Sequence, residues 1–142
     1  MALPVDSTII EHLKQFINPQ QLQVMLDAVP GEEGEHFRTK LMAMDLRIKN
    51  MAKTYEQDGK GDDAIVYLHY FLPSADWFIL EKDIDDDGEG QHQAFGYASL
   101  NGWPYEMGYI SIAELLAHNA ELDLYFDPCE VRDFKRTYMN GG

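Results

Sequence analysis

Cysteine pairs, long hydrophobic runs and a secretion signal are all missing from this sequence. Cys129 is the only cysteine among 142 residues, which excludes an internal disulfide framework and is typical of a reducing, cytoplasmic compartment. The longest apolar run, residues 64–72, is far shorter than the ~20 residues that a membrane-spanning helix needs. The N-terminus lacks the basic and then apolar pattern of a secreted protein. We therefore expect a cytoplasmic protein that does not contact a membrane.

Basic residues are scarce as well. The chain has 11 Lys and Arg residues against 25 Asp and Glu residues, a formal net charge of -14. Because phosphates are repelled by such a chain, this balance argues against direct binding to nucleic acid and favours a basic protein partner. The same acidity also has a simpler interpretation, since net charge keeps a protein soluble.

The few basic residues are unevenly spread. Five of them lie between Glu35 and Lys53, a stretch with only two acidic residues. This segment therefore predicts either a local nucleic-acid contact or pairing with acidic loops of the same chain. The five are Arg38, Lys40, Arg47, Lys49 and Lys53.

Apolar residues are present in the amount that one folded domain requires. Hydrophobic residues make up 45% and aromatic residues 12% of the chain, and this length is sufficient for a core without disulfides. We expect a single domain over residues 1–142, with a helical part at 1–55 and a β-rich part at 62–138.

Three helices are expected in the first part. Thr8 and Glu11 have capping-box spacing at the start of the first. Asn18 and Pro19 end it and begin the second, as N-cap and first helical residue. The third is predicted by apolar residues at alternating steps of four and three, which favour packing against the sheet of the same domain over pairing with another chain. These residues are Phe37, Leu41, Met44, Ile48 and Met51.

After residue 61 the sequence changes to a β-type composition. Segments rich in β-branched and aromatic residues are separated by turn formers, which predicts an antiparallel meander. Ser111 and Glu114 again have capping-box spacing and predict a short helix. The expected strands span residues 64–72, 76–82, 93–100, 107–110 and 122–126.

A last helix is expected near the C-terminus. Asp127 is suited to be its N-cap, Pro128 its first residue and Glu130 the N3 carboxylate. The predicted fold class is therefore α+β, with an antiparallel sheet of four to five strands packed by N-terminal helices and a C-terminal helix.

Four groups of residues in the second half follow one another in a recognisable order. They are Tyr70-Phe71 with Trp77 and Glu81, then Ala94-Phe95-Gly96, then Glu106 to Leu115, and finally Leu122 to Pro128. Together they resemble an uncharacterised family that is common on conjugative plasmids, integrative elements and phages, domain of unknown function 2958. The resemblance implies a mobile-element setting. It implies no chemistry, because the family has no established activity.

The segment after residue 82 is densely acidic. Its alternating Asp residues and Gly88 match the first half of a calcium-binding loop, but Ala94 stands where the twelfth position needs a bidentate Glu. A solvated hairpin loop is therefore favoured over a calcium site, and we expect no bound metal. The carboxylates of this loop are candidates for contacting a basic partner: Asp83, Asp85, Asp86, Asp87 and Glu89.

A second group of candidate contact residues precedes the fourth expected strand. Trp103 and Tyr105 lie in a loop and have the character of interface anchors, whereas most other aromatic residues are expected in the core. Glu106 adds a carboxylate in the same turn-like segment. We expect these three residues to contact a partner.

An enzymatic or ligand-binding interpretation uses different residues. His69 is predicted to face Glu81 across the hairpin, and with Glu106 this pair would polarise a water molecule or bind a metal. Convergence of any three of the carboxylates that carry the resemblance, Glu81, Glu106, Glu114 and Asp123, would create a site for a hard cation. A histidine satisfied by a neighbouring carboxylate is the simpler interpretation of the pair.

The remaining chemical signals are weak. Cys129 is expected in the first turn of the last helix, where the helix dipole favours a thiolate, but no histidine lies at a suitable spacing. The sequence has no zinc-ligand spacing, phosphate-binding loop or dinucleotide motif. We expect no cofactor and assign no catalytic residue.

Two hypotheses about function remain. The first is a non-catalytic acidic accessory protein of a mobile genetic element that binds a basic surface of a host or element protein, in one form inhibiting a nucleic-acid-binding defence complex of the CRISPR or restriction type. It assumes that exposed carboxylates gather into one field. The alternative is a small enzyme or a ligand- or metal-binding domain that uses His69, Glu81 and Glu106. Both are compatible with a monomer or a dimer.

Overall fold

Three helices form the N-terminal third of the protein in the computed structural model, which describes residues 3–84 and 90–139. Asn18 caps the second helix as predicted, because its side chain accepts a hydrogen bond from the amide of Gln21. The predicted cap at Thr8 is wrong, since Asp6 accepts from the Thr8 amide and begins the first helix earlier. The helices are α1 (Ser7–Leu13), α2 (Pro19–Ala28) and α3 (Gly34–Asn50).

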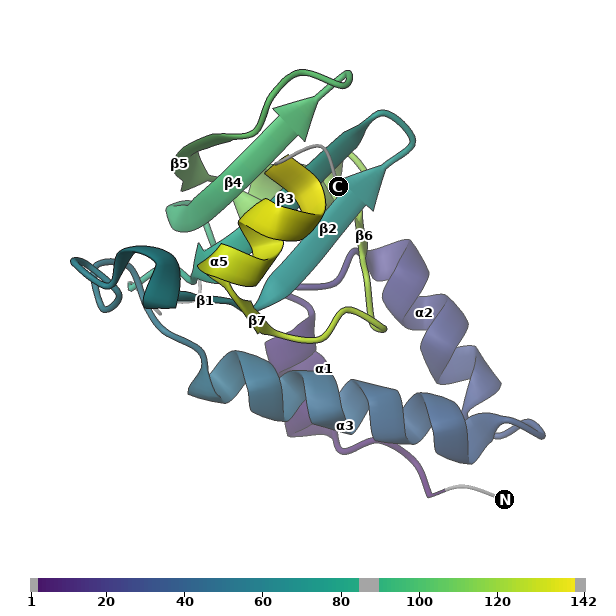
Figure 1. Ribbon diagram of the computed structural model, residues 1–142. Helices are drawn as coiled ribbons and strands as arrows, with labels where there is room; N and C mark the ends of the chain where they lie inside the picture. Colours follow the sequence, from purple (N-terminus) through teal and green to yellow (C-terminus); the bar gives the residue numbers. More distant parts are fainter. Residues whose placement is uncertain (1–2, 85–89, 140–142) are drawn as a thin grey trace.

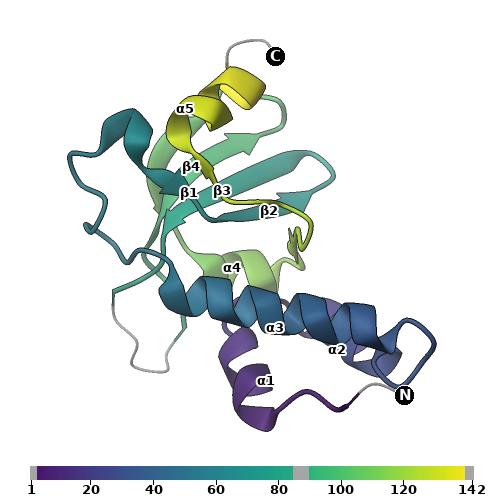
Figure 2. The same cartoon turned by 60° about the horizontal axis from the view of Figure 1, so that its bottom comes forward.

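The apolar seam of α3 faces the sheet of the same chain. Leu41, Met44 and Ile48 are buried in one cluster with Leu68 and Ile79 of the sheet. Figure 2 shows α3 lying along one side of the molecule, with α1 and α2 beside it. The predicted packing of this helix is therefore confirmed. Within the described ranges, each helix is too short or too polar to cross a membrane.

The described strands form two antiparallel sheets. The larger has the order β5-β4-β3-β2-β6, and the smaller pairs β1 with β7. The first expected strand is divided at Tyr67, because the residues before it pair with β7 and those after it pair with β3. The strands are β1 (Ile65–Val66), β2 (Leu68–Leu72), β3 (Ala75–Glu81), β4 (Ala94–Leu100), β5 (Glu106–Ile110), β6 (Glu121–Leu122) and β7 (Cys129–Glu130).

Each face of the five-stranded sheet has its own core. One face packs against the helices α1 to α3 and α4 (Ile112–Ala117), which Ser111 caps as predicted. The other face, which includes Phe78 and Tyr97, packs against α5 (Val131–Phe134), and this helix continues as a π-helix over Lys135–Met139. Figure 1 shows α5 lying across the sheet on this side. The predicted α+β class, an antiparallel sheet packed by N-terminal helices and a C-terminal helix, is confirmed.

The C-terminal helix begins later than the sequence predicts. Asp127 and Pro128 do not open it, because Cys129 and Glu130 pair with Val66 and Ile65 as strand β7. The long-range ladder with β1 therefore overrides the local helix-start signal.

Candidate functional site

The turn between β4 and β5 holds Trp103 in solvent. The Trp103 amide donates to the Leu100 carbonyl at 3.0 Å, and Asn101 and Gly102 between them have φ angles of 54° and 78°. This is the type I′ turn that Asn-Gly adopts readily in tight hairpins. The Ser99 hydroxyl also donates to the Trp103 carbonyl. The turn is thus fixed by two hydrogen bonds, while the indole remains 71% exposed.

Strand β5 forms an open edge of the larger sheet. Among the described residues it pairs with β4 alone, and Figure 1 shows it at the outer side of the sheet. Met107 and Tyr109 are 52% and 57% exposed, and they share the face that α5 covers elsewhere, because they pair with Tyr97 and Phe95. Glu106 is exposed on the opposite face.

Tyr55 extends this exposed surface. Its φ of 77° lies in the left-handed region, which costs a bulky residue about 1–3 kcal/mol and persists only when the surroundings enforce it. The two oxygens of Glu81 supply that support, because they accept from the amides of Tyr55 and Gln57 at 3.0 and 2.8 Å. The Tyr55 and Tyr109 hydroxyls lie 2.7 Å apart, and their hydrogen bond raises the pKa of Tyr109 above its ordinary value.

These exposed residues form one candidate site, which we call the β5 edge surface. Two hollows, of about 440 and 340 Å³, lie on either side of Trp103. Ala98, Leu100 and Glu106 line the first, and Tyr138 and Met139 line part of the second. The surface consists of Tyr55, Trp103, Glu106, Met107 and Tyr109.

Tyr105 is half-buried and packs against the core. Its ring lies 5.8 Å from that of Phe78, 5.5 Å from that of Phe134 and 6.5 Å from that of Tyr138. Burial also raises the pKa of its hydroxyl above the ordinary value. Of the predicted group of three, Trp103 and Glu106 are therefore exposed for a partner, while Tyr105 anchors the loop between them.

Asp83 is not a solvated loop residue as predicted. It is buried, and its Oδ2 accepts from the amides of His92 and Gln93 at 3.2 and 3.0 Å. Its own amide donates to the side chain of Gln91. Asp83 therefore closes the base of the loop, because a buried carboxylate needs donors. The other predicted contact residues of this loop, Asp85, Asp86, Asp87 and Glu89, lie outside the described residues.

His69 does not face Glu81, so the predicted pair is wrong. The ring of His69 stacks on Phe78 at 4.3 Å, with Nε2 2.7 Å from Asp76 and Nδ1 3.0 Å from Asp123. Both nitrogens can donate at once only when the imidazole carries two protons. The histidine thus links β2 to β3 and to the segment after β6.

The three residues of the enzymatic hypothesis are not brought together. Glu81 is 4% exposed and both of its oxygens bind backbone amides, whereas Glu106 is exposed on the edge strand β5. Among the described side chains, no three His, Cys, Asp or Glu residues are arranged to hold a metal ion. The geometry therefore gives no support to a shared reaction centre of His69, Glu81 and Glu106.

Cys129 is not in a helical first turn. It lies on β7, and burial raises the pKa of its thiol, with a further contribution from Asp133. A raised pKa favours the neutral thiol at pH 7, which is the less nucleophilic form.

Comparison with protein-family models, curated proteins and solved structures found no match to this chain. The resemblance to domain of unknown function 2958 stays a prediction.

The basic residues of α3 contact groups of the same chain. Arg47 donates to the Phe126 carbonyl at 2.8 Å, and the Lys40 ammonium lies 4.5 Å from the centre of the Tyr125 ring. Lys49 pairs with Asp45 at 2.8 Å. His36, also on α3, bonds to the hydroxyl of Tyr125. At least three of the five basic residues are therefore held by contacts within the chain, but the one ion pair among these contacts is with an Asp of α3 itself and not with an acidic loop.

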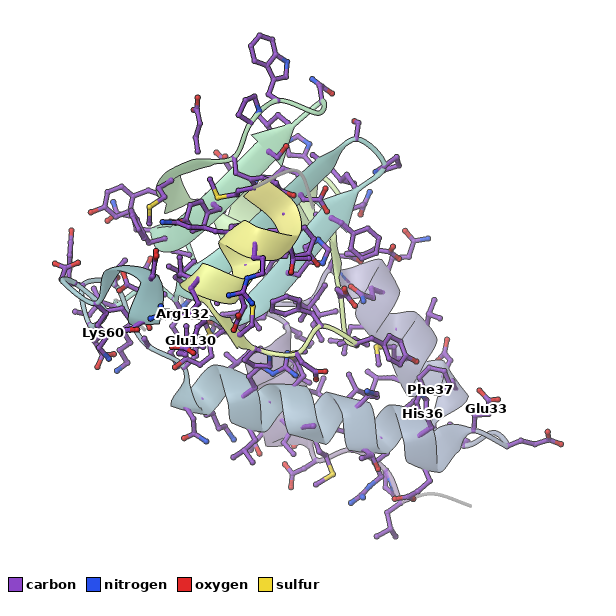
Figure 3. The ribbon with its side chains drawn as sticks, viewed as in Figure 1. Glu33, His36, Phe37, Lys60, Glu130 and Arg132 are labelled. Atoms are coloured by element: carbon purple, nitrogen blue, oxygen red, sulfur yellow. The ribbon has the colours of Figure 1, made fainter. Side chains whose placement is uncertain are left out.

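Some of the described carboxylates pair within the chain or stand apart from other charged groups. Glu33 points away from the chain at the end of α3, near His36, as Figure 3 shows. Asp62 and Asp63 pair with Lys135 and Arg132. The expected single acidic face stays a prediction, and the candidate docking site is defined by exposed side chains of the β5 edge surface.

A further hollow of about 510 Å³ lies between α2 and the β2–β3 turn. Its polar wall includes Asn18 and Gln21. Asn18 donates to the Ala120 carbonyl, and Gln21 both donates to the Leu122 carbonyl and accepts from the Leu122 amide. These side chains hold β6 against α2, so they are not available to a ligand.

Proposed function

We propose that this chain is a non-catalytic binding protein that docks on a basic surface of another protein through the β5 edge surface. The observation that supports this most is the exposure of Trp103, Met107 and Tyr109 on a turn and edge strand whose opposite face exposes the carboxylate of Glu106. Aromatic residues and Met are enriched in interface cores, and Trp and Tyr contribute much of the binding energy there.

The charge of the chain favours a basic partner. A formal net charge of -14 produces a long-range attraction that speeds encounter with a basic protein. At contact, Glu106 is a pairing group for Lys or Arg, and the exposed ring of Trp103 offers a face for cation–π interaction. Nucleic-acid-binding proteins carry such basic surfaces, so the proposal extends to competition with nucleic acid in a defence complex.

The groups suited to chemistry are used elsewhere, which supports binding over catalysis. His69 bridges two carboxylates and Glu81 binds two backbone amides. A role as an accessory protein of a mobile element rests on the sequence resemblance alone.

Capture of partners from an extract of the source organism tests the proposal. The immobilised full chain is compared with Trp103→Ala and with Leu46→Ala, a control on α3 whose side chain is 61% exposed. We expect wild type and the control to retain the same basic protein, and Trp103→Ala to lose it, because only that variant removes an anchor of the surface. We expect the captured protein to elute as NaCl is raised from about 0.05 to 0.5 M, because salt screens the attraction between opposite charges.

The captured protein, once purified, is then assayed for nucleic-acid binding in the presence of the chain. Displacement of the nucleic acid supports inhibition by competition. Equal capture by all three versions, or capture that salt does not affect, would contradict the proposed docking surface.

A further inference from the structure

We infer that the β5 edge takes up an extended segment of the partner protein as an additional strand, in which basic and apolar side chains alternate. This inference rests on the proposed function and specifies the conformation and sequence class of the partner.

The backbone of β5 is suited to strand addition. Sheet edges in proteins are protected by Lys or Pro, by bulges or by short length, because an open edge pairs with other chains. Residues 106–110 include no Lys or Pro, and their pairing with β4 runs without a register shift. The opposite edge, β6, has only two residues. Among the described strands, β5 is therefore a long edge strand without these protective features.

The two faces of β5 require different side chains from an incoming strand. On one face, exposed Met107 and Tyr109, with Tyr55 bonded to the latter, favour apolar groups. On the other face lie Glu106 and Gly108, and a Cβ placed on Gly108 would meet nothing within 4 Å. A long basic side chain opposite Gly108 can occupy this space and reach Glu106, since diagonal neighbours lie about 7–8 Å apart.

Charge decides between a different protein and a second copy of this chain. Two β5 strands paired antiparallel about Gly108 would place Met107 opposite Tyr109 on both sides, an apolar match. They would also bring together two chains of net charge -14 each. Because this repulsion opposes self-association and favours a cationic segment, the inference commits to a basic partner segment.

Backbone methylation separates strand pairing from charge attraction. The probe is an eight-residue peptide of alternating Lys and Val with blocked ends. It is made in three forms. One has unmodified backbone amides, one carries N-methyl groups on the amides of the Lys residues, and one carries them on the amides of the Val residues. Binding to the full chain is measured by calorimetry at low salt. Strand addition predicts a loss of about tenfold or more for one methylated form, whose methyl groups face β5, and little loss for the other.

The outcomes also separate this inference from the proposed function. If all three peptides bind equally well and their binding weakens with salt, strand addition is overturned, while docking of a basic partner by charge attraction is still supported. Failure of every peptide to bind, even at low salt, would count against both.

Two variants of the chain provide the matched test. Met107→Glu and Leu46→Glu add the same charge, so attraction by charge alone predicts equal effects on peptide binding. Strand addition predicts about tenfold weaker binding for Met107→Glu only, with thermal unfolding used to confirm that both variants fold.

Sedimentation of the chain alone is the final check. A dimer that Met107→Glu abolishes would identify a second copy as the occupant and overturn the assignment to a basic segment.

Discussion

At the scale of single residues, the carboxylate of Glu81 holds the loop that displays Tyr55. It is buried, and each of its oxygens accepts a hydrogen bond from a backbone amide of that loop. Gln57 completes the anchor, because its side chain donates to the carbonyls of Ile65 and Leu80 and accepts from the Ile65 amide. The positive φ of Tyr55 is therefore maintained with the help of a carboxylate that lies 26 residues away in the sequence.

Glu81→Ala is expected to lower the free energy of unfolding by about 3 kcal/mol, because two amides lose their acceptor in a buried site. Urea denaturation measures this value, and Glu32→Ala, at an exposed position, is expected to change it by less than about 0.5 kcal/mol. A loss for Glu81→Ala no greater than for the control would show that the carboxylate does not support the loop.

At the scale of elements, two glycines on neighbouring strands differ in how closely other atoms approach them. Gly96 and Gly108 are cross-strand partners on β4 and β5. A Cβ on Gly96 would lie 1.9 Å from the Phe78 carbonyl oxygen, whereas one on Gly108 would meet nothing within 4 Å. The inner strand therefore excludes a side chain at a position where the edge strand tolerates one.

Gly96→Ala is expected to destabilise the protein by about 3 kcal/mol or to prevent folding, because the backbone of β3 must move to admit the methyl group. Gly108→Ala, its partner on the edge, is expected to change the melting temperature by no more than a few degrees. Thermal unfolding followed by circular dichroism compares the two. Similar melting temperatures for both variants would contradict the close approach of β3 and β4.

At the scale of the whole molecule, an excess of negative charge surrounds two apolar cores. The sheet separates a cluster under the N-terminal helices from an aromatic cluster under α5. Many carboxylates remain outside both clusters, so repulsion among them opposes the compact state.

Added salt is therefore expected to raise the melting temperature by several degrees between about 0.01 and 0.5 M NaCl, as the Debye length falls from about 30 Å to less than 10 Å. A double variant, Glu32→Lys with Glu33→Lys, changes the formal charge from -14 to -10, since each substitution adds two positive charges. Salt is expected to raise the melting temperature of this variant less than that of the wild type, because the variant has less repulsion to screen. A fall with salt in the wild type would mean that attractive ion pairs outweigh the repulsion.

Local patterns in the sequence were sufficient for most of the elements. Helix caps and the apolar seam of a helix depend on residues within one or two turns, and a strand is recognised from alternation along its own length. The predicted caps at Asn18 and Ser111, the seam of α3 and the antiparallel meander agree with the structure. Trp103 was predicted as an exposed anchor from its loop context, and it is exposed. Its tight turn also had a local signal, the pair Asn101-Gly102.

The sequence by itself determined the class of fold, the meander of β2 to β5 and the net acidity, but not the place of β6 beside β2 or the pairing of β1 with β7. Only the tertiary structure decided that β5 is an open edge with Met107 and Tyr109 in solvent, that Asp83 and Glu81 are buried, and that His69 binds Asp76 and Asp123. The physical reason is that burial and hydrogen-bond partners depend on contacts between segments distant in the chain. A carboxylate therefore looks the same in the sequence whether it meets a partner or supports a loop.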